Sequence, residues 1–128
     1  MAIIRFWIDG IPPNDNATRR LVWQAKAKER EQWRHLAFYA ATAGMRVGRA
    51  SLHFPLDKAL VRFDFHFGAR RRHDWDNLVA SLKPVIDGIV DAGVVVDDDL
   101  KHFRGEIGSA VYGEKKPGIW ISVSEGEW

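Results

Sequence analysis

The stretch ALVRFDFHF at residues 59–67 constrains the fold most, because apolar and polar side chains alternate along it. Val61, Phe63 and Phe65 fall on one side of this pattern, and charged or polar residues fall between them. Successive side chains of a β-strand point to opposite faces of the sheet. The stretch therefore predicts a half-buried strand, in a sheet with one face against the core and one face toward solvent.

The other patterns complete what we interpret as a single domain, residues 1–128. Runs of β-branched and aromatic residues predict strands, and long helix formers with apolar residues three and four apart predict helices. In chain order we expect a strand at 3–8, a helix at about 20–43, the strand at 59–67, a helix at about 76–92, a strand at 101–112 and a last strand at 119–123. The core-facing side of the first helix is expected to carry Trp33, Leu36, Ala37 and Ala40.

This β-α-β-α-β-β order indicates an α+β fold, with a mixed four-stranded sheet and two helices packed on one face. The middle strands and helix would form a parallel crossover, and the last two strands would form a hairpin. Pro84 should kink or restart the second helix, because proline removes the hydrogen bond to the Ala80 carbonyl. The core-facing stripe of that helix is expected to be Leu78, Leu82, Val85 and Ile89.

Charge is distributed unevenly along the chain. Residues 1–73 hold 14 Lys and Arg against 6 Asp and Glu, whereas residues 74–99 hold 7 Asp against one Lys. A basic region followed by an acidic segment is typical of a protein that binds a polyanion and also binds cations. The alternative is that these charged residues only form solvent-exposed faces and bind no partner. The chain has no cysteine, no signal peptide and no apolar run of the ~20 residues that span a bilayer, so we expect a cytoplasmic protein without a membrane partner.

Two groups of aspartates within residues 70–99 are candidate metal ligands. Asp74 and Asp76 point the same way if their backbone is extended, and two close carboxylates repel unless a proton or a metal ion lies between them. Three more aspartates at 97–99 follow an apolar run. Mg²⁺ prefers oxygen ligands and usually takes one or two carboxylates. The alternatives are that Asp74 or Asp76 caps the following helix and that residues 97–99 form an ordinary turn.

The helix after the first aspartates extends this polar pattern. At 100° per residue, Asp76, Lys83 and Asp87 fall within about 40° of one another, and Asp91 lies another ~40° round. Lys83 and Asp87 are also four residues apart, so a surface salt bridge is the plainer interpretation of that pair.

Basic residues provide a counterpart for phosphate groups. Those that we expect to bind the phosphates of a polyanion are Arg70, Arg71 and Arg72, directly before the aspartates, and Arg19 and Arg20 in a second basic stretch. We assign Trp33 to the core, and Trp23 either to the core or to a surface that stacks on a base. His73, beside Asp74, is a candidate supporting group or proton carrier.

The segment RRRHDWDNL…LKPVIDGIVDAGVVVDDD resembles the signature of the RusA-type endodeoxyribonucleases, the Holliday junction resolvases of bacteria and their phages. The family pattern is a basic run, D-x-D-N-L, a lysine with an aspartate four residues later, a glycine and a D-D pair. Here these are Arg70 to Arg72, Asp74 to Leu78, Lys83 with Asp87, Gly93, and Asp97 with Asp98. The chain departs from the compact pattern by about three extra residues before Lys83, close to one helical turn.

The resemblance implies a homodimeric, Mg²⁺-dependent nuclease that recognises branched DNA and cuts strands symmetrically at a four-way junction. It implies a catalytic acidic cluster of Asp74, Asp76 and Asp98, with Lys83 as the functional lysine. We also expect Asp97 among the metal ligands and Asn77 among the DNA contacts. The neighbouring Asp99 leaves the assignment within 97–99 open by one residue.

Our hypothesis is metal-assisted phosphodiester hydrolysis, in which the aspartates hold Mg²⁺ and Lys83 stabilises the developing negative charge. One alternative is a dimeric branched-DNA-binding protein with the same fold and no nuclease activity, which the extra residues before Lys83 favour. Another alternative is a small metal-dependent phosphatase or nucleotide-processing enzyme. It is weaker, because the sequence has no glycine-rich phosphate loop.

Overall fold

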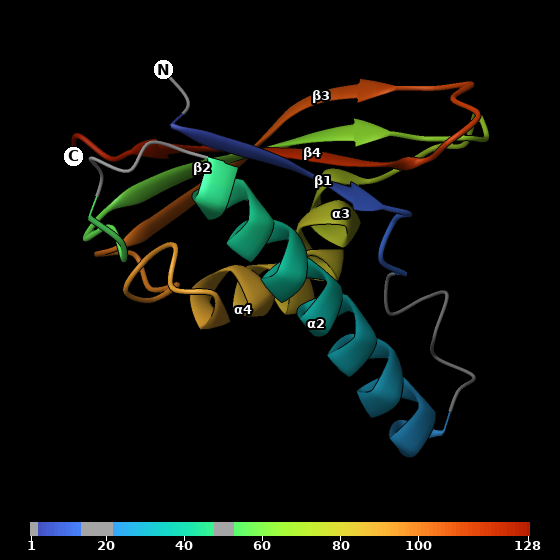
Figure 1. Cartoon of the computed structure of the whole chain (residues 1–128). Coiled ribbons are helices and arrows are strands. Elements are labelled where there is room, and N and C mark those ends of the chain that lie inside the picture. Colours follow the sequence, from blue (N-terminus) through green and yellow to red (C-terminus); the bar gives the residue numbers. More distant parts are fainter. Residues whose placement is uncertain (1–2, 14–21, 48–52) are drawn as a thin grey trace.

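The computed structural model describes residues 3–13, 22–47 and 53–128, and Figure 1 shows how they are arranged. They form four strands and three helices. In chain order these are β1 (Ile4–Asp9), α2 (Trp23–Val47), β2 (Ala59–His66), α3 (Trp75–Ser81), α4 (Lys83–Asp91), β3 (Phe103–Val111) and β4 (Gly118–Glu125).

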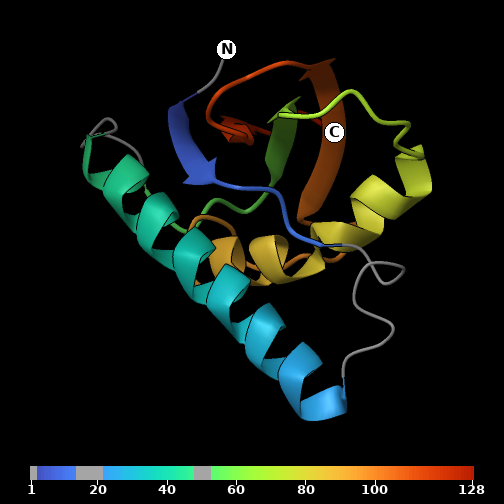
Figure 2. The ribbon, with the colours of Figure 1, turned by 90° about the vertical axis from the view of Figure 1, so that its right-hand side faces the viewer.

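The predicted fold class is confirmed, because the strands form one mixed sheet in the order β1-β4-β2-β3. Strand β4 is antiparallel to both of its neighbours, and β2 and β3 are parallel. Helices α2 and α4 lie on one face of the sheet, as Figures 1 and 2 show from two directions. The connection from β2 to β3 runs through α3 and α4, the kind of crossover that a parallel pair requires.

The predicted hairpin between the last two strands is wrong. Strand β4 lies between β1 and β2, and β3 lies at the edge of the sheet. Ile119, Ile121 and Val123 of β4 are fully buried, whereas β3 buries only Phe103. A strand with several buried side chains stabilises the sheet most from its middle, and the more polar β3 suits an exposed edge.

Pro84 divides the predicted helix at 76–92 into two helices. Helix α3 ends at Ser81 and α4 begins at Lys83, with Leu82 between them. The proline lies in the first turn of α4, where its missing N–H would have no helical partner. Asp76 therefore belongs to α3, and Lys83 belongs to α4, so the angles of one continuous helix do not apply across the break.

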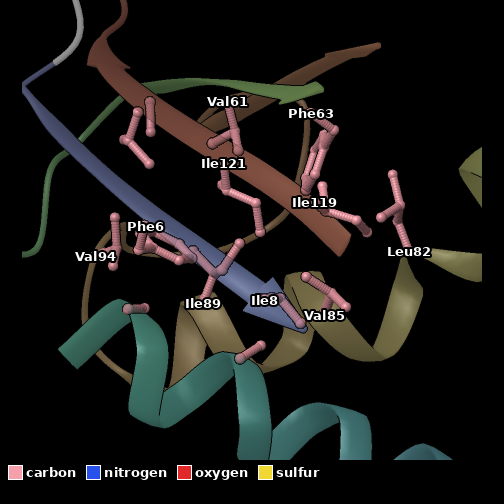
Figure 3. Packing of buried hydrophobic residues seen from close by; sticks show 14 of the residues in the cluster. Phe6, Ile8, Val61, Phe63, Leu82, Val85, Ile89, Val94, Ile119 and Ile121 are labelled. Atoms are coloured by element: carbon pink, nitrogen blue, oxygen red, sulfur yellow. The ribbon is translucent and has the colours of Figure 1, made fainter. Parts of the chain in front are cut away.

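The core lies between the sheet and the helices, and Figure 3 shows part of it. The alternation in β2 is confirmed, since Val61, Phe63 and Phe65 are buried. The predicted stripe of the second helical region is also present: Leu82, Val85 and Ile89 are buried, and Leu78 packs against them in part.

The core-facing side of α2 differs from the prediction by one residue. Ala37 and Ala41 are buried, and Trp33 and Ala40 pack partly against the core. Leu36 is exposed instead, because the buried side is centred on Ala37 and Ala41 and a one-residue step turns a side chain by 100°.

Helices α2 and α4 make their closest contact at Gly88. A Cβ atom at this position would lie 2.3 Å from the Arg34 carbonyl oxygen and 2.8 Å from the Ala37 Cβ. Close by, the Arg34 guanidinium donates two hydrogen bonds to the Asp91 carboxylate, at 2.5 and 2.8 Å. This bidentate pair lowers the pKa of Asp91 and raises the pKa of Arg34, mainly through the hydrogen bonds themselves.

Strands β1, β2 and β3 all run in the same direction, so their carboxyl ends meet at one edge of the sheet (Figure 1). The segments that follow these strands are joined there by backbone hydrogen bonds. The Gly10 amide donates to the Pro117 carbonyl at 2.8 Å, and the Gly113 amide donates to the Gly68 carbonyl at 3.1 Å. We call this the carboxyl edge.

Within the described residues, every helix is too short or too polar to cross a lipid bilayer.

Replacing Gly88 with alanine should destabilise the fold, although alanine favours helices by about 1 kcal/mol over glycine. The added methyl group overlaps the backbone of α2 and must push the two helices apart, which typically costs about 1–3 kcal/mol. Urea unfolding of wild type and Gly88→Ala measures the difference. Ala43→Gly, at an exposed position of α2, is the control for helix propensity alone. A Gly88→Ala protein at least as stable as wild type would contradict the close contact.

Candidate functional site

The start of α3 is placed by an aromatic contact at the carboxyl edge. Phe67 follows β2 and is buried, and the His73 ring stacks on it with 3.9 Å between centroids and 10° between planes. Tyr112 completes the cluster, 5.3 Å from Phe67 and 6.3 Å from His73 between ring centroids. This stack holds the backbone directly before Asp74, and the role of His73 as a supporting group or proton carrier stays a prediction.

Asp74 and Asp76 occupy different kinds of backbone. Asp74 is extended, at φ −82° and ψ 139°, whereas Asp76 lies in the first turn of α3. The expectation that both lie in extended backbone is therefore wrong, because the helix begins between them. Asp74 holds the N-cap position without capping, and its carboxylate accepts a hydrogen bond from Arg72 Nε at 3.1 Å. Asp76 accepts one from the backbone amide of Asn77 at 3.0 Å.

Lys83 brings together two other aspartates of the motif. Its ammonium donates to Asp98 Oδ2 at 2.5 Å and lies 3.0 Å from Asp87 Oδ1. The predicted pair of Lys83 and Asp87 is confirmed, and the loop at 97–99 reaches the start of α4. Hydrogen bonding to Asp98 and then to Asp87 raises the pKa of Lys83, and the bond from Lys83 lowers the pKa of Asp98.

The three adjacent aspartates have different roles in the structure. Asp97 accepts a hydrogen bond from the amide of Asp98 at 2.7 Å, and Asp99 accepts from the amides of Lys101 and His102 at 3.0 and 3.2 Å. Asp99 is thus part of a local turn, as the plainer interpretation expected for this run. Asp98 alone is hydrogen-bonded to Lys83, which favours Asp98 within the predicted pair.

Two hollows lie on either side of Pro12 and Pro13 and share Ser81 as a wall. The first, which we call the helix hollow, has a volume of about 600 Å³. It lies between α2 and the start of α4, and its charged walls are Lys26, Glu29, Arg30, Glu31, Arg34, Lys83 and Asp87. The GIPPND turn marks this place in the sequence, but nothing local indicates that α2 would face it.

The second hollow, the edge hollow, has a volume of about 450 Å³ and lies at the carboxyl edge. Its walls include Phe67, Arg71, His73, Asn77 and Pro117. Arg71, Asn77 and Leu78 line the edge hollow, and Lys83 and Asp87 line the helix hollow. Five residues of the predicted motif therefore face adjoining depressions.

The predicted DNA contacts fall into three groups. Arg70 and Arg71 are exposed beside the edge hollow, and Arg72 is bound to Asp74. Arg19 and Arg20 lie outside the described residues.

Among the tryptophans, Trp33 packs against the core and its Nε1 donates to Glu29 at 3.1 Å. Trp23 is 73% exposed, which excludes the core alternative for it.

The carboxylates are chemically suited to a hard divalent cation. Asp87 and Asp98 already share one positive charge, the Lys83 ammonium. Among the residues that the structure describes, no three His, Asp or Glu side chains are grouped so that they could hold one ion. Mg²⁺ usually takes only one or two carboxylates and keeps water and substrate oxygens as its other ligands, so smaller sets of these aspartates fit it. The convergence of Asp74, Asp76 and Asp98 stays a prediction.

Replacing Lys83 with methionine should raise the carboxyl pKa of Asp98 toward the ordinary aspartate value of about 3.9. In wild type, the pair stabilises the fold above that value and loses its effect as the pH falls through the lower pKa of folded Asp98. An NMR titration of the aspartate carboxyl carbons measures this shift.

Asp91 is the internal control, because its pKa is lowered by Arg34 and should not change in Lys83→Met. Equal Asp98 titrations in the two proteins would show that Lys83 does not bind Asp98 in solution.

No model of a known protein family matches the chain, and a search of curated proteins finds no match either. The likeness to RusA-type nucleases therefore depends on the motif residues and on where the fold places them.

Proposed function

We propose that the chain is a Mg²⁺-dependent endodeoxyribonuclease of the RusA type, which cuts branched DNA such as a four-way junction. One observation supports this proposal above the others. Lys83 and Asp98, which are 15 residues apart and belong to the same motif, meet by hydrogen bond at the start of α4. This meeting lies beside a hollow with further cationic side chains, where a DNA phosphate has room.

In this proposal Asp74, Asp76 and Asp98 would hold the metal ion, with Asp97 as a further candidate. When bound, Mg²⁺ polarises the scissile phosphate and lowers the pKa of an attacking water. The extended conformation of Asp74 and the helical position of Asp76 place these carboxylates at the end of a loop, where they are exposed to a polymeric substrate.

Lys83 supplies positive charge without a change of protonation. Its raised pKa keeps the ammonium charged at any physiological pH, and its position at the first residue of α4 leaves the side chain more than half exposed. It can therefore stabilise negative charge that develops on the phosphate or on the leaving oxygen.

The arginines before α3 would bind the sugar-phosphate backbone. Arg70 and Arg71 are exposed next to the candidate site, and such contacts position DNA without recognising its sequence. Arg72 has a second role, because its hydrogen bond to Asp74 orients that carboxylate.

Symmetric cutting of two strands requires two sites related by a two-fold axis, so we propose that the active form is a homodimer.

The second candidate function, a dimeric protein that binds branched DNA without cutting it, is favoured by the absence of a three-carboxylate group among the described residues. The two candidates predict the same binding and differ in cleavage.

Asp74→Asn and Asp98→Asn should each lower the rate of junction cleavage in Mg²⁺ by at least about 100-fold, because even groups that only support metal ligands contribute about 10- to 100-fold. Junction binding should stay equal or become tighter, since a negative charge beside DNA is removed. Cleavage gels and gel shifts on a labelled four-way junction measure the two effects.

Asp57→Asn, an exposed aspartate before β2, is the matched control and should cut normally. Full cleavage by Asp74→Asn would refute the nuclease proposal. Tight junction binding by wild type, without cleavage in Mg²⁺, would leave the non-catalytic candidate.

Arg70→Ala and Arg71→Ala should weaken junction binding and reduce its salt dependence. Each lost phosphate contact should lower the slope of log K against log salt concentration by about 1. Gel shifts over a range of KCl concentrations measure this slope. Arg46→Ala, in the last turn of α2, is the control and should leave the slope unchanged. Unaltered slopes in both arginine variants would exclude these residues from the DNA contact.

A further inference from the structure

The edge hollow has walls that come from three separate segments at the carboxyl edge. Pro12 follows β1, Phe67 follows β2, and Pro117 precedes β4. Leu78 of α3 adds a fourth apolar wall. Because the segments are joined by backbone hydrogen bonds, this is a structured depression, and its walls are partly apolar and partly polar.

The edge hollow also has polar groups in its walls. Asn77 contributes its side-chain amide, which has no hydrogen-bond partner among the described residues, and Arg71 contributes an exposed guanidinium. Ser81 is already committed, since its hydroxyl donates to the Leu78 carbonyl at 2.7 Å. The amide of an asparagine offers one acceptor and two donor hydrogens in a single plane.

We propose that the edge hollow receives a single nucleobase that has turned out of the DNA strand, with Asn77 hydrogen-bonded to the edge of the base. This inference rests on the proposed function and names a substrate contact that the function itself does not require. Proteins that bind an extruded base hold it against aromatic or apolar side chains and recognise it through hydrogen bonds to its edge. His73, Pro12 and Pro117 provide the first kind of contact, and Asn77 provides the second.

The size and position of the hollow support a base rather than a phosphate. About 450 Å³ lies within the usual range for small-molecule sites, and the lining residues include only one permanent cation, Arg71. That arginine stands at the rim, where it can bind the phosphate attached to the same nucleotide. Branched DNA suits such a site, because bases next to a crossover are unstacked at a lower cost than bases within a duplex.

Asn77 lies directly after Asp76 and, through that position, near the strand that the proposed nuclease would cut. A base held by Asn77 would set which nucleotide stands beside the candidate metal ligands. The planar amide pairs best with a base edge that presents a donor beside an acceptor, as adenine does in its N6 and N7 groups. The edge hollow would thus give the enzyme a preference among the four bases at one position.

The test uses four-way junctions that carry 2-aminopurine, a fluorescent base, at each position next to the crossover in turn. The Asp74→Asn protein in Mg²⁺ keeps the DNA uncut. We expect a fluorescence change on binding at one position, and an abasic nucleotide at that position should weaken binding by about tenfold, the order of one lost base contact.

At the position so identified, junctions with each of the four bases measure selectivity. Asn77→Ala in the Asp74→Asn background should bind all four with equal affinity, whereas Gln32→Ala, an exposed amide on α2, should keep the selectivity. Asn77→Asp has nearly the same shape, so it serves as the second variant if the alanine protein does not fold. It should invert the order of preference, because a carboxylate only accepts hydrogen bonds.

Normal junction binding without a fluorescence change at any position would overturn the nucleobase inference and leave the proposed function intact. Unchanged base selectivity in the folded Asn77 variants would do the same. Failure of the protein with an intact Asn77 to bind any junction would instead remove both the proposed function and this inference.

Discussion

The close contact between α2 and α4 is the constraint on which the arrangement of the site depends. Gly88 has no side chain, so the backbone of α2 at Arg34 lies where a methyl group would otherwise be. The paired charges of Arg34 and Asp91 then hold the two helices in register. Because α4 begins only a few residues before Gly88, this contact also fixes the position of Lys83 and the helix hollow beside it.

The sheet provides the second constraint, because three of its four strands end at one edge. Loops from distant parts of the chain must gather there, and the residues after β2 lead directly into α3. The stack of His73 on Phe67 connects that loop to the buried part of the sheet.

Electrostatics at the site reflect pairing more than burial. The carboxylates of Asp74, Asp87 and Asp98 all lie within reach of a cationic side chain. The pKa of Asp98 is lowered, because its hydrogen bond to Lys83 outweighs the opposite effect of burial. Such pairs at a partly exposed surface contribute little to stability. They hold the acidic groups next to positive charge at the surface.

The sequence by itself determined the features that depend on neighbours along the chain. Alternation in β2, the break at Pro84 and the pair of Lys83 with Asp87 are local, because each involves residues within one turn or one strand. Tertiary structure alone decided the place of β4 between β1 and β2 and the hydrogen bond from Lys83 to Asp98. These features depend on which buried surfaces pack together over long separations, and the spacing of residues contains no information about that packing.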